Sequence, residues 1–111
     1  MEKKFDLSGA LHALDRQIDG LDEFRTDPGL AGFDASAGFV LCQTISRIAE
    51  LPCLPMMTEA IRTRFLALVQ LRSLYERTGK IDSSQIREVV ESSREIVAAC
   101  RQEFELFVRE G

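Results

Sequence analysis

The strongest constraint on the fold is the residue pattern from 81 to 111, which is typical of one long amphipathic helix. Asp82 and Gln85 have the spacing of a capping box, in which each side chain accepts a hydrogen bond from the other's backbone N–H group. Ile81 and Ile86 stand at the positions of a hydrophobic staple. Apolar residues then recur at three- and four-residue steps, which predicts one buried face; they include Val89, Val90, Val97, Cys100, Phe104, Phe107 and Val108.

Three further helical segments precede this one. The first, 7–24, has an unbroken apolar stripe, made of Leu7, Leu11, Leu14, Ile18 and Leu21. The second, 34–50, has Asp34 or Ser36 as its expected N-cap, and its small residues Ala37, Gly38 and Ala49 favour a close helix crossing. The third, 56–78, is the most apolar, and we expect it to be the most buried.

Turn residues separate these segments. An Asp-Pro-Gly turn follows the first helix, and Pro52 and Pro55 interrupt the chain after the second. Only Gly79, Lys80 and Ile81 separate the third helix from the fourth, so those two helices must fold back antiparallel. Because alternating β-branched runs are absent, the sequence predicts an all-α antiparallel four-helix bundle in a single domain, 1–111.

Composition limits the class of function. The chain is 45% hydrophobic and 29% charged, and it has no apolar run near the ~20 residues of a membrane span. Together with an N-terminus that lacks a signal-peptide pattern, this predicts a soluble cytoplasmic protein with no membrane partner. A formal charge of −4 with scattered basic residues makes nucleic acid an unfavoured partner. Three cysteines without a CxxC pair suggest neither disulfides nor a zinc site.

No residue pattern indicates catalysis. The only histidine, His12, lies on the polar face of the first helix, and Asp15 beside it would repel a phosphoryl group. Bundle metal sites use Glu-x-x-His pairs, which the sequence lacks. We therefore predict no catalytic residue, no metal and no cofactor. Cys42 and Cys100 are expected to point inward as near neighbours, and packing is the expected role of both.

Two arginines interrupt the apolar arc of the third helix. Arg64 and Arg72 must each reach a carboxylate, a carbonyl or an anionic ligand, since an unpaired buried charge is too costly. The simpler interpretation is that both reach the rim of the core and pair with acidic residues of another helix or subunit. The alternative is an anion-binding site of a small-molecule sensor, which Arg94 and Arg101 could join.

Five apolar residues fall outside the predicted core: Phe39, Val40, Leu66, Val69 and Leu106. Contiguous exposed apolar residues often mark a partner surface. Our leading hypothesis is therefore a small non-enzymatic interaction module, such as an adaptor, a chaperone-like protein or a regulatory subunit. It would act through its helix faces, as a homodimer or with a heterologous helical partner. The small-molecule binder is the alternative, and a nucleic-acid-associated subunit is a weaker third possibility.

Overall fold

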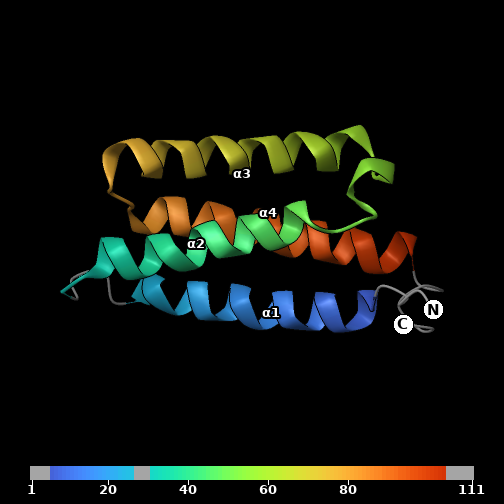
Figure 1. Ribbon diagram of the computed structural model, residues 1–111, viewed down its shortest axis with the longest axis horizontal. Helices are drawn as coiled ribbons and strands as arrows, with labels where there is room; N and C mark the ends of the chain where they lie inside the picture. Colours follow the sequence, from blue (N-terminus) through green and yellow to red (C-terminus); the bar gives the residue numbers. More distant parts are fainter. Residues whose placement is uncertain (1–5, 27–30, 105–111) are drawn as a thin grey trace, which may run out of the picture.

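Four helices lie side by side in a computed structural model of the chain, which describes residues 6–26 and 31–104 (Figure 1). They are α1 (Leu7–Glu23), α2 (Phe33–Ala49), α3 (Glu59–Thr78) and α4 (Ser83–Glu103), with short 3-10 turns at η1 (Phe24–Thr26) and η2 (Leu54–Met56). Successive helices run in opposite directions (Figure 1). The predicted all-α antiparallel bundle is confirmed.

The helices do not contribute equally to the bundle. In Figure 1, α1 and α3 lie on opposite sides, with α2 and α4 between them. α4 packs against both α1 and α3, and α2 also contacts both. None of the described helices is both long and apolar enough to cross a membrane. Because its packing contacts are with α2 and α4, α3 turns its opposite side away from the rest of the molecule.

The helix starts show where local sequence rules hold and where they fail. The capping box of α4 is confirmed, since Gln85 N donates to Asp82 Oδ1 at 2.9 Å and Asp82 N donates to Gln85 Oε1 at 3.0 Å. α2 differs from the prediction: it begins after Gly32, which has a φ of 75° and makes no side-chain cap. Asp34 instead accepts a hydrogen bond from Ile81 N at 2.9 Å. A long-range bond to the α3–α4 connection thus takes the place of a local cap.

Two other helix ends differ from the sequence prediction. α3 begins at Glu59 with Thr58 as its N-cap, three residues later than expected, because the segment around Pro55 forms the separate turn η2. α4 ends at Glu103, and Phe104 has left helical geometry with a φ of −123° and a ψ of 36°. The remainder of the helix that we predicted to reach 111 lies outside the described residues.

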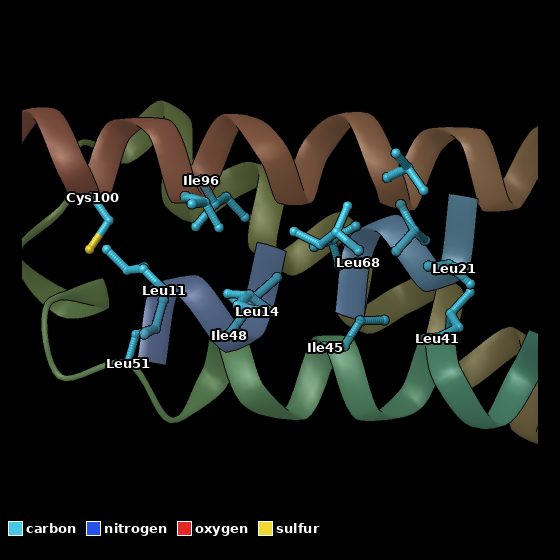
Figure 2. Close-up of a cluster of buried hydrophobic side chains, with 14 of the residues drawn as sticks. Leu11, Leu14, Leu21, Leu41, Ile45, Ile48, Leu51, Leu68, Ile96 and Cys100 are labelled. Atoms are coloured by element: carbon cyan, nitrogen blue, oxygen red, sulfur yellow. The ribbon is translucent and has the colours of Figure 1, made fainter. Parts of the chain in front are cut away.

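The core fills the space between the four helices, as Figure 2 shows for its centre. Leu14 of α1, Ile48 of α2, Leu68 of α3 and Ile96 of α4 are among the side chains that extend into this space, and Cys100 lies near Leu11 and Leu51 at one end of the view. The stripe predicted for α1 is buried along its whole length, since Leu7, Leu11, Leu14, Ile18 and Leu21 are all 5% exposed or less. The apolar periodicity therefore identified the inner faces of α1 and α4.

The prediction that the third helix is the most buried is wrong. Leu68 is the one buried residue among the twenty of α3, whereas α1, α2 and α4 bury five, seven and eight. Its apolar residues spread over a broad arc, and a helix that packs on one side can bury only the middle of that arc. Phe65 and Leu71, each about 60° from Leu68, are consequently only partly buried against the core.

The predicted close crossing occurs between α2 and α3. Gly38 is buried, and a Cβ atom added there would lie 1.9 Å from Cζ of Tyr75. The Tyr75 ring thus occupies the space that a side chain at position 38 would need. Ala37 is also fully buried, whereas Ala49 is exposed. The glycine allows the two helices to approach with an aromatic ring between them.

Candidate functional site

The apolar residues predicted as a partner surface separate into two groups. Phe39 and Leu66 are exposed, at 63% and 59%. Val40 and Val69 are partly buried and pack against the core, and Leu106 lies outside the described residues. Phe39 borders a shallow hollow of α2 lined otherwise by Cys42 and polar residues, namely Gln43, Ser46, Arg47 and Glu50. The surroundings of Phe39 are therefore mainly polar.

Sequence reasoning missed one exposed apolar residue. Met56 is 67% exposed and ends η2, where we expected the first residue of the third helix. The two prolines nearby are the signal that could have placed it in a turn, because they prevent a regular helix start. Met56 lies before α3 and outside the helix, so it offers a comparison for the exposed residues of α3.

The outer side of α3 is defined by its one buried residue. Leu68 is completely buried, and residues nine positions away lie two and a half turns along, on the opposite face, at about 3.6 residues per turn. Those residues are Glu59 and Arg77. Leu66 and Gln70 fall within about 20° of the same line. We call these four residues the outer stripe of α3, and all four are exposed.

The outer stripe contains charges that have no partner within the described part of the molecule. Neither Glu59 nor Arg77 forms an ion pair with another described residue, whereas Arg64 and Arg72 of the same helix both do. Glu59 lies in the first turn of α3 and Arg77 in the last, each where the helix dipole favours its charge. Opposite charges thus mark the two ends of an exposed helical face with Leu66 near its middle.

The two arginines proposed as an anion site each have a carboxylate partner. Arg64 Nε lies 2.6 Å from Glu95 Oε2 of α4. Arg72 Nε lies 3.7 Å from Glu76 Oε1 in the next turn of α3, beside Cys42 of α2. The first arginine faces α4 and the second faces α2. Arg64 therefore pairs with an acid of another helix, as the simpler interpretation expects, whereas Arg72 pairs within its own helix.

Arg94 and Arg101 do not join them. Arg94 Nη2 lies 3.0 Å from Asp19 Oδ1 and 3.6 Å from Asp22 Oδ2, and Arg101 donates a hydrogen bond to Asp15. All three acids belong to α1, so these pairs line the seam between α1 and α4. The prediction that they could extend a site around Arg64 and Arg72 is wrong, because the partners lie on the other side of α4. Partly exposed pairs of this kind contribute up to ~1 kcal/mol each and align antiparallel helices.

The cysteine pair differs from the one predicted. Cys53, in the turn after α2, and Cys100, in the last turn of α4, are both buried with their sulfur atoms 2.7 Å apart. Cys42 instead lies on the α2 surface that faces α3 and is only partly buried. Burial, followed by the hydrogen bond with Cys53, raises the pKa of Cys100 to about 12. At neutral pH this thiol therefore stays protonated and is a poor nucleophile, which favours a packing role.

The other residues considered for chemistry are dispersed. His12 is exposed on α1, as its place on the polar face predicts. Within residues 6–26 and 31–104, no three His, Cys, Asp or Glu side chains gather closely enough to hold a metal ion. Comparison of the chain with family models, with curated proteins and with solved structures finds no match. Function must therefore be inferred from the side chains themselves.

Proposed function

We propose that this chain is a small protein-interaction module without enzymatic activity, and that it self-associates through the outer stripe of α3. The observation that carries the proposal is the imbalance in burial between the helices. α3 is twenty residues long and buries one, although apolar residues recur along its whole length. A helix of this kind gains most from a second surface that covers its free side.

Leu66 is the residue that should contribute most to such a contact. Its side chain is 59% exposed and lies one turn from Val69, which is only partly covered. Full burial of a leucine side chain is worth ~1.5–3 kcal/mol, so covering the exposed half contributes about 1 kcal/mol for each Leu66. In a symmetric dimer both Leu66 side chains are covered, so their contributions add. The sum corresponds to roughly a thirtyfold change in the dissociation constant of the dimer.

The test is the oligomeric state measured by size-exclusion chromatography with light scattering over a wide concentration range. The wild-type chain should gain mass with concentration toward a dimer. Leu66→Glu should stay monomeric at the same concentrations, with unchanged helical content by circular dichroism. Met56→Glu is the matched control, because it removes a similarly exposed apolar side chain outside α3.

Two outcomes would count against the proposal. A wild-type chain that stays monomeric at the highest concentration would rule out self-association. Equal loss of the dimer in Leu66→Glu and Met56→Glu would show that the contact does not depend on α3.

A further inference from the structure

The arrangement of charges on α3 carries the proposed function one step further, to the direction and register of the pairing. Glu59 and Arg77 lie eighteen positions apart, which is five helical turns and about 27 Å along the axis. Both therefore point the same way, directly opposite the buried Leu68. Position 68 is also the midpoint between them and the midpoint between Leu66 and Gln70.

A second copy of α3 can meet this face in only one direction without repulsion. If the copies run parallel, Glu59 faces Glu59 and Arg77 faces Arg77, and like charges oppose each other at both ends. If they run antiparallel about a two-fold axis at position 68, each Glu59 faces Arg77 of the second copy. Such a symmetric contact is closed and self-complementary, so it stops at a dimer.

We propose that two copies of this chain pair through antiparallel α3 helices, with Glu59 of each copy opposite Arg77 of the other. Each Leu66 then lies beside the two-fold axis, opposite Gln70 of the other copy. The inference rests on the self-association proposed above. It adds a specific register, in which position i on one copy faces position 136 − i on the other. The charged pairs fix the direction, while the leucines supply the apolar contact.

The other charged groups of α3 are compatible with this pairing. Arg64 is held by Glu95 and Arg72 by Glu76, so both are neutralised inside the protomer. Arg62 lies about 60° from the outer stripe. In this register it faces position 74, which is Leu74. Its long side chain can therefore extend past the contact into solvent without meeting a like charge.

Charge reversal in pairs tests the register. Glu59→Lys gives a stripe with positive charges at both ends, and Arg77→Glu gives one with negative charges at both ends. Each variant alone should dimerise about tenfold more weakly than wild type, because two attractive pairs become repulsive. An equimolar mixture of the two should recover the wild-type dimer mass, since positions 59 and 77 of the two different chains then carry opposite charges wherever they face each other.

The mixture also removes the main ambiguity of single variants. Both substitutions place a charge at the unfavourable end of the helix dipole and can weaken α3 itself. That penalty stays in each chain after mixing, so recovery reports the pairing between copies alone. Glu88→Lys, an exposed site on α4, changes the net charge as Glu59→Lys does and should leave the dimer unaffected.

The outcomes distinguish the antiparallel register from self-association itself. Weak association of both variants with recovery in the mixture supports the antiparallel register. A wild-type dimer that neither variant weakens, or that mixing does not restore, overturns the register while self-association stands. A wild-type monomer at all concentrations overturns both.

Discussion

Replacing Gly38 by alanine should lower the stability of the protein or leave it unchanged, whereas the same substitution at an ordinary helix position should raise it. In a helix interior, Gly→Ala normally stabilises by up to ~1 kcal/mol, because glycine loses more backbone entropy on folding. At Gly38 the new Cβ would lie 1.9 Å from Cζ and 2.2 Å from the hydroxyl oxygen of Tyr75. Real atoms cannot approach so closely, so the ring must leave its place.

The magnitude follows from two opposing terms. Displacing packed side chains by overpacking costs ~1–3 kcal/mol. Subtracting a helix-propensity gain of ~1 kcal/mol leaves Gly38→Ala neutral to about 2 kcal/mol less stable than wild type. In a Tyr75→Ala background the obstacle is gone, so Gly38→Ala should stabilise by ~0.5–1 kcal/mol. The coupling free energy between the two positions is therefore ~1–3 kcal/mol.

Urea denaturation followed by circular dichroism measures each corner of this double-mutant cycle. Gly20→Ala in α1 is the matched control, because a Cβ there meets no atom within 4 Å and the backbone φ is not positive. It should stabilise by up to ~1 kcal/mol in both the wild-type and the Tyr75→Ala background. If Gly38→Ala stabilises the wild-type chain as much as Gly20→Ala does, the close approach of α2 and α3 is refuted.

Two further predictions concern buried polar groups of α4. Ser93 is fully buried and its hydroxyl has no hydrogen-bond partner among the described residues. Ser93→Ala should therefore raise the free energy of unfolding, measured in urea, by ~1 kcal/mol. A decrease in that free energy of the same size would show that the hydroxyl is hydrogen-bonded. Cys100 keeps its proton in the folded state up to a pKa of about 12 but releases it near 9.0 when unfolded. Stability should therefore be full below pH 9 and fall between pH 9 and about 12 by up to ~1.4 kcal/mol per pH unit. Cys100→Ala should lack that part of the slope, and identical slopes would contradict the burial of the thiol.

Features that depend on neighbours within one or two turns were predictable from the sequence. The apolar stripe of α1, the capping box of Asp82 and the antiparallel α3–α4 connection all depend on residue spacing along one helix or one short turn. Helical geometry converts such spacing directly into faces and ends. For this reason the fold class and the inner faces of α1 and α4 agree with the prediction.

Two of the departures involve partners that are distant in the sequence. Asp34 bonds to Ile81, 47 positions away, in place of capping its own helix. Cys100 meets Cys53, also 47 positions away, and Cys42 does not approach it. Spacing along a helix shows that a residue points inward, but it does not show which inward-pointing residue of another helix lies at the same height in the bundle.

In the candidate site, too, some features follow from local sequence and others from distant packing partners. The sequence by itself determined that α3 is an apolar helix with charges at its ends and Leu66 outside the main arc. Only the tertiary structure decided that one residue of that helix, Leu68, is buried and that the face opposite it is open. The physical reason is that a helix of broad apolar arc can satisfy its sequence pattern in several orientations, and packing against α2 and α4 selects the one that leaves the outer stripe exposed.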